Sequence, residues 1–399
     1  MDKEPEYNPD RLILLDEESA PVPERLLLAH AKGKVLFLTG AGISQPANLP
    51  DFRSLVLDVY SQVDIATHAV LEKINPAACN AWEASDTHLG EKERAEVRRF
   101  IMRDYDVVLG MLERRMDGQG SRTSKVRRAV ASVLRNAEEK HASIHRSLMQ
   151  LSDRGGSVAI ATTNFDGLLE RAARYSRIPV ESYALGAIPR PSTQGDFAGI
   201  FHIHGMLDRD PSRLSDIIVT DHDFGEFYLR RRTIPDFIYD AARLYHLVLV
   251  GYSANDPPMR YLLNAVAADG TRFADFKERF SFVGGPEPSN ARELQDWLGR
   301  GITPIAYHNA NGHAALAHTL EQWSKLFSNR GDSSARDKAL RKIVKRPRKE
   351  ASDVDRDLFD HIIRRASPNE RGLLTQQVSE AGADLDWLDS ITAIARETR

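Results

Sequence analysis

Short apolar segments rich in β-branched and aromatic residues alternate along this chain with longer segments of helical periodicity. Most of the short segments lack the strict alternation of apolar and polar residues that marks a strand with one solvated face. That pattern is typical of a parallel sheet covered by helices on both faces, so we predict a Rossmann-like α/β fold. The segments that predict strands are Val35–Leu38, Val158–Thr162, Gly199–Ile203, Ile217–Thr220, Leu247–Val250, Phe280–Val283 and Ile302–Tyr307.

The strand pattern stops after Arg53 and resumes only at Val158. Between them, residues such as Val108 and Leu112 recur at helical spacing. Because the sheet resumes directly afterwards, we interpret residues 56–150 as a helical insertion and not as a separate domain. The domain that contains it is expected to span residues 1–327.

The C-terminal part of the chain differs in character from this domain. Residues 328–352 are polar and then basic, which predicts a linker. Residues 353–399 are expected to form a helical assembly segment. Its two amphipathic helices would lie at Asp353–Arg365 and Gly372–Arg396, separated by a break at Ser367-Pro368.

Net charge and cysteine content exclude several classes of protein. The formal net charge is −3 for 399 residues, so no global field favours nucleic acid or a membrane. The single cysteine, Cys79, excludes an internal disulfide framework and a zinc ribbon. No apolar stretch approaches the ~18 residues needed to cross a bilayer, and the N-terminus lacks the apolar core of a signal peptide. We therefore expect a cytoplasmic protein without a metal site or membrane contact.

One local exception to the balanced charge is the basic stretch from Lys338 to Lys349. A solvated linker, or a docking surface for an acidic partner, is the interpretation that we favour over contact with nucleic acid phosphates. Any contact with nucleic acid is therefore expected to be indirect, through a partner.

Four predicted strands end in residues suited to ligand contact, namely Gly40, Asn164, His204 and Gly251. Because ligands of open α/β sheets bind at the carboxyl ends of the strands, we expect these four endings to form one site. The glycines of the first ending let the backbone turn sharply and approach a ligand, and the N–H groups of such a turn suit a diphosphate. A Gly-x-Gly after a strand is also compatible with a simple turn, so this motif alone is weak evidence.

Further motifs strengthen the hypothesis, because they follow one another in a recognisable order. The motifs are Gly40-Ala-Gly-Ile-Ser44 with Pro50-Asp-Phe-Arg53, Thr162-Thr-Asn-Phe-Asp166, His202-Ile-His-Gly205 and Gly251-Tyr-Ser-Ala-Asn-Asp-Pro257. Their order resembles the NAD-consuming sirtuin superfamily over roughly residues 26–327.

Departures from the family pattern indicate a particular branch. Protein-deacylating sirtuins usually carry a four-cysteine zinc module between the His-Gly and Gly-x-Ser motifs, whereas residues 206–250 contain no cysteine. Thr163 replaces a glutamine, and the last motif extends to Asp256 and Pro257. With the helical insertion, these features resemble the sirtuin-like NAD hydrolases of bacterial antiphage systems. A short chain with a helical tail resembles the subunit of that group that assembles with a hexameric HerA-type ATPase, which implies a homo-oligomer.

The resemblance implies roles for individual residues. Asn164 would position water and the ribose hydroxyls, and His204 would be the catalytic base. NAD⁺ would be the substrate, with no separate cofactor and no zinc. The remaining substrate contacts would come from Gly40, Ala41 and Gly42 near the diphosphate, Ser44 as a hydroxyl donor, Asp51 and Phe52 near nicotinamide, Arg53 near phosphate, Gly251 and Ser253 near adenosine, Asp166 behind the Asn164 loop, and from Thr163 and Asp256.

The leading hypothesis is thus an NAD⁺ glycohydrolase that releases nicotinamide and ADP-ribose and depletes NAD⁺ during phage infection, under the control of a partner or of assembly. Two alternatives remain open, an NAD-dependent protein deacylase and a non-catalytic module that binds NAD or ADP-ribose. Asn164 could also be a helix cap, although Asp166 is the better candidate for that role. His202 is interpreted as structural.

Overall fold

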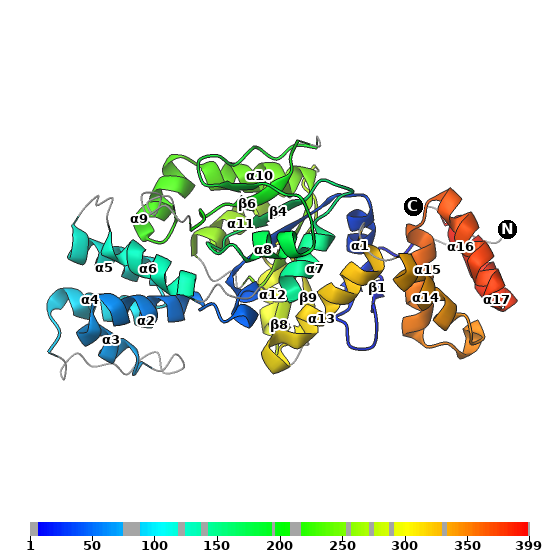
Figure 1. Cartoon of the computed structure of the whole chain (residues 1–399), viewed down its shortest axis with the longest axis horizontal. Coiled ribbons are helices and arrows are strands. Elements are labelled where there is room, and N and C mark those ends of the chain that lie inside the picture. The colour runs from blue at the N-terminus through cyan, green and yellow to red at the C-terminus, as the bar shows by residue number, and fades with distance from the viewer. Residues whose placement is uncertain are drawn as a thin grey trace.

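A parallel sheet forms the centre of the computed structural model, which describes residues 7–74, 88–118, 124–136, 143–193, 196–207, 217–252, 257–270, 275–286, 291–328 and 333–397. The seven strands are arranged in the order β5-β6-β4-β3-β7-β8-β9, and all neighbours are parallel (Figure 1). The predicted α/β fold is therefore confirmed. The strands are β3 (Val35–Thr39), β4 (Ala159–Thr162), β5 (Ser182–Ala184), β6 (Gly199–His202), β7 (His246–Val250), β8 (Arg279–Gly285) and β9 (Thr303–His308).

Six of the seven predicted strand segments are strands, and the prediction for Ile217–Thr220 is wrong. These residues are buried, but they form the approach to helix α9 (Asp221–Phe224). The Thr220 side chain caps that helix by accepting a hydrogen bond from the Asp223 backbone N–H. Burial alone therefore produced the apolar pattern here. The sequence pattern also missed the edge strand β5 and a short antiparallel pair, β1 (Leu12–Ile13) and β2 (Val22–Pro23).

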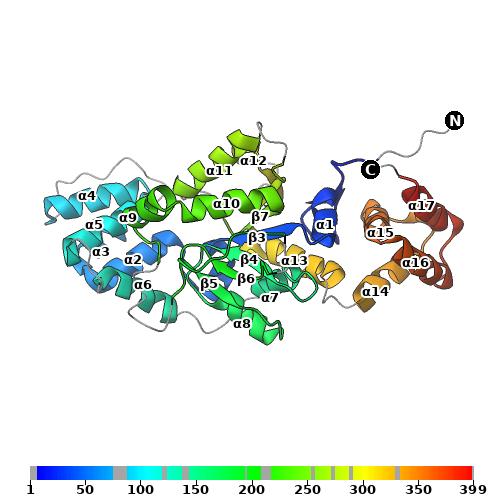
Figure 2. The same cartoon turned by 90° about the horizontal axis from the view of Figure 1, so that it is seen from above.

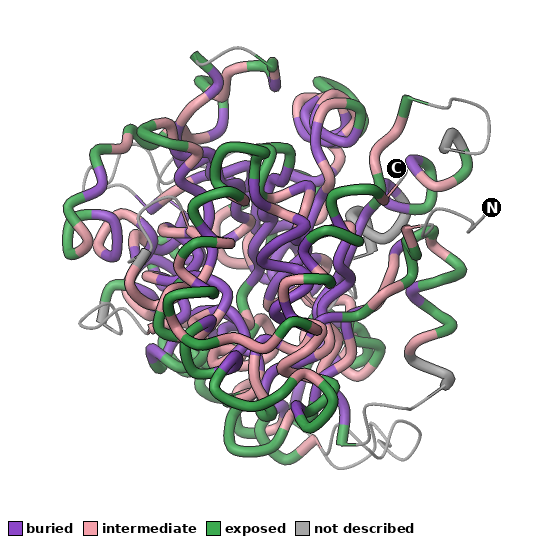
Figure 3. The backbone as a smooth tube through the Cα atoms, turned by 90° about the vertical axis from the view of Figure 1, so that its right-hand side faces the viewer, coloured by how far each residue is buried: buried purple, intermediate pink, exposed green. Residues whose placement is uncertain are grey.

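Helices cover both faces of the sheet, as Figure 2 shows. Alternate residues of β3 enter different cores, with Val35 and Phe37 in one and Leu36 and Leu38 in the other, as the pleat of a strand requires. The first core is completed by α1 (Glu24–Ala31), α7 (Ser143–Leu151), α8 (Leu168–Tyr175) and α13 (Ala310–Phe327). The second is completed by α10 (Thr233–Leu244), α11 (Pro257–Gly270) and α12 (Ala291–Leu298). Figure 3 shows the buried backbone concentrated in this central region.

The helical insertion leaves the sheet after β3 and lies at one end of the molecule (Figure 1). Its helices enclose a third hydrophobic core of their own, which also takes in Leu168, Leu207, Ile217 and Val219. Helix α7, at the end of the interval interpreted as insertion, packs on the sheet instead. The insertion helices are α2 (Phe52–Val63), α3 (Ile65–Leu71), α4 (Glu91–Ile101), α5 (Tyr105–Asp117) and α6 (Lys125–Asn136).

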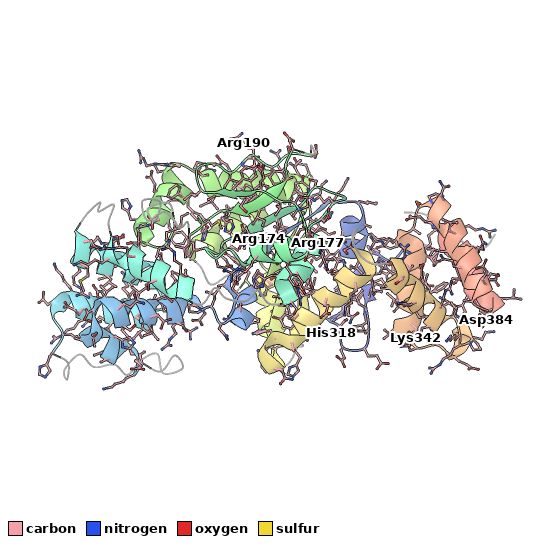
Figure 4. All side chains as sticks on the ribbon, in the orientation of Figure 1. Arg174, Arg177, Arg190, His318, Lys342 and Asp384 are labelled. Atoms are coloured by element: carbon pink, nitrogen blue, oxygen red, sulfur yellow. The ribbon has the colours of Figure 1, made fainter. Side chains whose placement is uncertain are left out.

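The C-terminal helices lie at the opposite end of the molecule (Figure 1). Part of the segment interpreted as a linker is helix α14, from which Lys342 extends at the surface (Figure 4). The expected second helix of the tail is two helices, because Gly382 at φ 85° ends the first and the Asp384 side chain caps the next. The C-terminal helices are α14 (Ser333–Ile343), α15 (Asp353–Arg365), α16 (Pro368–Glu380) and α17 (Leu385–Ala395).

Candidate active site

The ends of four adjacent strands meet at one edge of the sheet. Thr39 at the end of β3 is paired with Thr162 of β4 and with Val250 of β7, and Thr162 is paired in turn with His202 of β6. The chain passes from β3 to β4 on one side and later returns to β7 on the other side, so the strand order reverses between β3 and β7. Such a reversal is where open α/β sheets bind ligands. The expected convergence of the four strand endings therefore agrees with the sheet register.

Two glycine turns pack directly against each other at this reversal. The Gly42 N–H donates to the carbonyl oxygen of Gly251 at 2.8 Å, and the Gly40 N–H donates to Val250 at 3.0 Å. A Cβ on Gly42 would lie 2.8 Å from the Gly251 oxygen, and one on Gly40 would lie 2.7 Å from the Tyr252 ring. Gly251 also has φ +63°, a conformation that favours glycine. Contact between the two turns thus accounts for these glycines, whereas the sequence suggested the approach of a ligand.

The N–H groups of the first turn are also engaged within the protein. Besides Gly40 and Gly42, Ile43 donates to Gly40 at 3.2 Å and Ser44 donates to Ala41 at 3.0 Å. The turn is a short 3₁₀ helix, and Ala41 is exposed on it. Contact between this turn and a diphosphate stays a prediction.

Asn164 is the centre of a buried hydrogen-bond network that joins the β3 and β4 loops. Its side-chain amide donates to the Gly40 carbonyl at 3.1 Å and to Ser44 Oγ at 3.0 Å. Ser44 Oγ donates in turn to Asp166 Oδ2 at 2.9 Å, and Asp166 Oδ1 accepts from the Leu168 N–H. Burial raises the pKa of Asp166. Because both amide N–H bonds of Asn164 are used, the group that it can offer a ligand is its carbonyl oxygen, a hydrogen-bond acceptor.

His202 supports Asn164 from the neighbouring strand. Its Nδ1–H donates to the backbone carbonyl oxygen of Asn164 at 2.9 Å, and its Nε2–H donates to Glu170 Oε1 at 2.8 Å. Burial lowers the pKa of His202, but the hydrogen bond and charge of Glu170 outweigh it and leave the pKa raised. An imidazole that donates from both nitrogens carries a positive charge. His202 therefore fixes the loop, in agreement with its interpretation as structural.

His204 has the opposite character, although it follows His202 by two residues. The side chain is buried, and its Nε2 lies 2.7 Å from the hydroxyl oxygen of Tyr228. Burial lowers the pKa of His204 to about 3, so the imidazole is neutral at pH 7. A neutral imidazole can accept a proton. The site thus combines an acceptor on Asn164 with a neutral imidazole on His204.

Tyr228 was not identified from the sequence. It lies on a π-helix, Gly225–Arg230, which directly continues α9. The aromatic residues Phe224 and Tyr228 both contact His204 edge-on, with ring centroids 5.7 and 5.9 Å away. Their spacing of four residues predicts that they share one face of a helix. Nothing in the local sequence connects this helix to His204, which lies 24 residues before Tyr228.

The Pro-Asp-Phe-Arg motif points its side chains into the helical insertion. Asp51 caps α2 by accepting from the Ser54 N–H at 2.7 Å. Phe52 packs edge-on against Tyr105, with ring centroids 5.8 Å apart. Arg53 donates to the Ile74 carbonyl at 3.1 Å, and its guanidinium lies over the Phe100 ring. The structure joins this motif to the insertion and does not place it in the Asn164 network, so its contacts with nicotinamide and phosphate stay predictions.

The remaining predicted substrate residues divide into two groups. Thr163 is half-buried and donates to the Thr39 carbonyl through its N–H at 3.0 Å and through Oγ1 at 3.4 Å. Ser253 and Asp256 lie outside the described residues.

Among the residues that are described, no group of three or more His, Cys, Asp or Glu side chains is arranged to hold a metal. Within the same ranges, no helix has the length and apolarity needed to cross a membrane.

Comparison with known proteins supports a sirtuin-like relationship. Residues 158–305 match the model of the SIR2-like domain family, an interval that contains both Asn164 and His204. The matched interval begins just before β4 and ends within β9. The chain is also 31% identical over 397 residues to an uncharacterized protein, y4cA, of Sinorhizobium fredii. The similarity covers 94% of this chain but 29% of the relative, so the chain spans less than a third of that protein's length.

Proposed function

We propose that this chain is an NAD⁺ glycohydrolase that cleaves the bond between nicotinamide and ribose and yields nicotinamide and ADP-ribose. The observation that carries the proposal is the placement of Asn164 and His204 just after the carboxyl ends of the adjacent strands β4 and β6. Asn164 offers its side-chain carbonyl oxygen as an acceptor, because both of its amide N–H bonds are already used. His204 offers a neutral, buried imidazole.

These two groups match what the reaction needs. Breaking the glycosidic bond develops positive charge on the anomeric carbon, while nicotinamide leaves as a neutral molecule, so no strong general acid is required. The reaction needs an acceptor that orients a water or a ribose hydroxyl, and a base that takes its proton. Asn164 and His204 can fill these roles.

The surrounding network keeps the acceptor in a fixed orientation. Ser44, Asp166 and Gly40 hold the Asn164 side chain, and His202 holds its backbone. Groups that are already oriented need no rearrangement as charge develops in the transition state. The network therefore favours a catalytic role for Asn164 over that of a simple helix cap.

The wider function is part of the same proposal. NAD⁺ is the substrate, and no additional cofactor or zinc ion is used. The chain acts in the cytoplasm as a homo-oligomer, controlled by a hexameric HerA-type ATPase, and it depletes NAD⁺ as an antiphage defence. Such control is expected because an unregulated NADase would poison its own cell. The sequence resemblance supports these statements.

The decisive experiment is release of nicotinamide from NAD⁺ by the purified chain, alone and with the product of a neighbouring gene. Asn164→Ala and His204→Ala should each lower the rate at least about 100-fold. Circular dichroism should show that both variants remain folded. Full activity in either folded variant would refute the role assigned to that residue.

Two further measurements separate the alternatives. A deacylase would convert acetylated peptide and NAD⁺ into O-acetylated ADP-ribose, whereas a hydrolase gives the same nicotinamide release without peptide. A non-catalytic module would bind NAD⁺ in calorimetry without releasing nicotinamide, even with the partner present. Either result would replace the proposed hydrolase.

A further inference from the structure

We propose that Tyr228 is a positioning residue for His204, and that the helical insertion holds Tyr228 in place. In this arrangement Tyr228 occupies Nε2 of the imidazole, and Nδ1 is the nitrogen that takes the proton from the substrate. The inference rests on the proposed function, because it specifies which atom of His204 acts as the base and what controls it.

The contact between the two side chains carries the first step. Nε2 of His204 and the Tyr228 hydroxyl are 2.7 Å apart, and both side chains are buried. A neutral imidazole has one nitrogen that donates and one that accepts, and the partner of the first determines the role of the second. If Nε2 carries the hydrogen and donates it to the hydroxyl oxygen, the lone pair lies on Nδ1. The proton from water or a ribose hydroxyl then moves to Nδ1 and gives an imidazolium.

The backbone around Tyr228 supports a special role for this position. The four-residue helix α9 continues directly into the six-residue π-helix Gly225–Arg230. Such π-helical turns are rare and are often found at functional sites. The wider turn sets where Phe224 and Tyr228 lie along the helix, and both rings contact His204.

The helical insertion contacts α9 through a buried ion pair between Arg127 and Asp223. Nη2 of Arg127 on α6 lies 2.8 Å from each carboxylate oxygen of Asp223. The same guanidinium donates to Glu113 on α5 at 2.9 Å and to the Ile217 carbonyl at 2.8 Å. Asp223 in turn accepts from the N–H and hydroxyl of Thr220 at the start of α9. A single buried cation thus ties two insertion helices to the helix that leads into Tyr228.

A second, more exposed contact has the same effect. Arg114 on α5 donates to Asp221 on α9 at 3.0 Å. A Cβ on Gly110 of α5 would lie 1.9 Å from Asp221 Oδ1, so a glycine inside the helix lets α9 approach. Gly costs about 1 kcal/mol relative to Ala in a helix, so the close approach is maintained against helix propensity. A shift of the insertion would therefore move Tyr228 and disturb the orientation of His204.

The test uses Tyr228→Phe in the full chain. It should lower kcat for nicotinamide release about 10- to 100-fold, as loss of a supporting hydrogen bond commonly does, with KM changed less than about 2-fold. A two-bond ¹H–¹⁵N spectrum of ¹⁵N-histidine-labelled protein should show His204 as the Nε2–H tautomer in the wild type and as a mixture in the variant. His204→Ala assigns the signal.

Tyr307→Phe is a matched control. The hydroxyl of Tyr307 lies 2.8 Å from Nδ1 of His313, between β9 and α13, so it forms a similar, partly buried contact in another part of the molecule. This variant should leave kcat and the His204 signal unchanged. If Tyr228→Phe does the same, or if the wild-type His204 carries its hydrogen on Nδ1, the positioning role is wrong. The spectrum does not depend on turnover, so a chain without NADase activity would refute the proposed function and still test the contact.

The coupling to the insertion is tested with Arg114→Ala. We expect kcat to fall about 2- to 5-fold at unchanged KM, as expected for an exposed ion pair. Arg99→Ala breaks an ion pair within the insertion, between Arg99 and Asp104 at 2.9 Å, and should leave kcat unchanged. Equal rates for the two variants would refute control of His204 through α9.

Discussion

The helical insertion and the C-terminal helices are two all-helical additions at opposite ends of the same sheet (Figures 1 and 2). The insertion encloses a hydrophobic core of its own, whereas Leu340, Phe359 and Trp387 of the C-terminal helices belong to the same core as one face of the sheet. The C-terminal helices therefore form part of the body that carries the sheet, whereas the insertion packs on itself and on a few neighbouring residues such as Leu168 and Val219.

The two additions also contact different elements of the sheet body. The insertion holds α9, the helix next to His204, through Arg127 and Arg114. The C-terminal helices contact α1, which precedes the first strand of the sheet, through His361 and Arg364. The comparison indicates that changes in the insertion should alter catalysis, and that changes in the C-terminal helices should alter stability.

A buried carboxylate fastens the C-terminal helices. Glu24 on α1 is fully buried and accepts from Nδ1 of His361 at 3.0 Å and from Nη1 of Arg364 at 2.7 Å. Burial raises the pKa of Glu24, but the hydrogen bonds and charges of His361 and Arg364 outweigh it, so the pKa is lowered. Arg364 also pairs with Glu397 at 2.7 Å. Removing the Arg364 guanidinium would leave the Glu24 carboxylate buried without its main cationic partner.

The largest expected effect is therefore that of Arg364→Ala. Breaking a buried ion pair on one side typically costs about 3–5 kcal/mol, and chemical unfolding should show a loss of this size. Nicotinamide release per folded molecule should stay at the wild-type rate. Lys349→Ala is the control, because Lys349 is 84% exposed and its pair with Asp386 is at the surface. If Arg364→Ala lost activity without losing stability, the C-terminal helices would act on catalysis, contrary to the role inferred for them.

A smaller effect is expected where the turn after β7 packs against the turn through which the chain leaves the sheet for the insertion. In Gly251→Ala the new Cβ would lie 2.5 Å from the Ile43 N at φ +63°, so the two turns must separate. We expect a loss of about 1–3 kcal/mol in the free energy of unfolding, together with a fall in kcat. Gly186→Ala has a similar positive φ but no atom within 4 Å. Gly186→Ala should lose less free energy of unfolding, because it measures backbone strain alone. Equal losses in the two variants would mean that contact between the two turns contributes nothing to stability.

Much of the sheet was predictable because strands buried on both faces leave continuous apolar runs. All five residues of β3 are buried, and its run was recognised. The edge strand β5 has three residues, none of them buried, and left no such signal. At Ile217–Thr220 a buried approach to a helix produced the pattern of a strand. Convergence of the strand endings was predictable from the parallel sheet alone.

The parts of the site that were not predictable depend on contacts between residues distant in the chain. Asn164 and His204 follow strands, so their motifs located them. The Tyr228 contact depends on a π-helix, and the glycine turns depend on each other across more than 200 residues. Glu24 and His361 are separated by 337 residues. Nothing in local sequence pairs such side chains, because folding of the whole chain brings them together.

The smallest expected effects concern pH, since buried histidines lie on α15 (His361) and at the end of β6 (His202). Burial lowers the pKa of His361, and the hydrogen bond of Glu24 only partly opposes this. A histidine whose folded pKa lies below its unfolded value of about 6.5 stabilises the fold fully above that pH, and its contribution is lost as the pH falls. His202 has a raised pKa, so its contribution is present below about pH 6.5 and is lost as the pH rises through its folded value. When the pH is lowered from 7.5 to 5, the free energy of unfolding should therefore decrease less for His361→Gln than for the wild type, as measured by chemical unfolding.

The rate of catalysis per folded molecule should not show the pH dependence that is expected for stability. Because burial lowers the pKa of His204 to about 3, the base remains neutral from pH 8 to pH 5. We expect kcat/KM per folded molecule to show no inflection near pH 6.5, when the folded fraction is measured by circular dichroism in the same buffers. An inflection there, in a pH range where the folded fraction is constant, would mean that His204 titrates as a solvated histidine. The buried contact with Tyr228 would then not describe the working enzyme, and control of the base by the insertion would lose its structural basis.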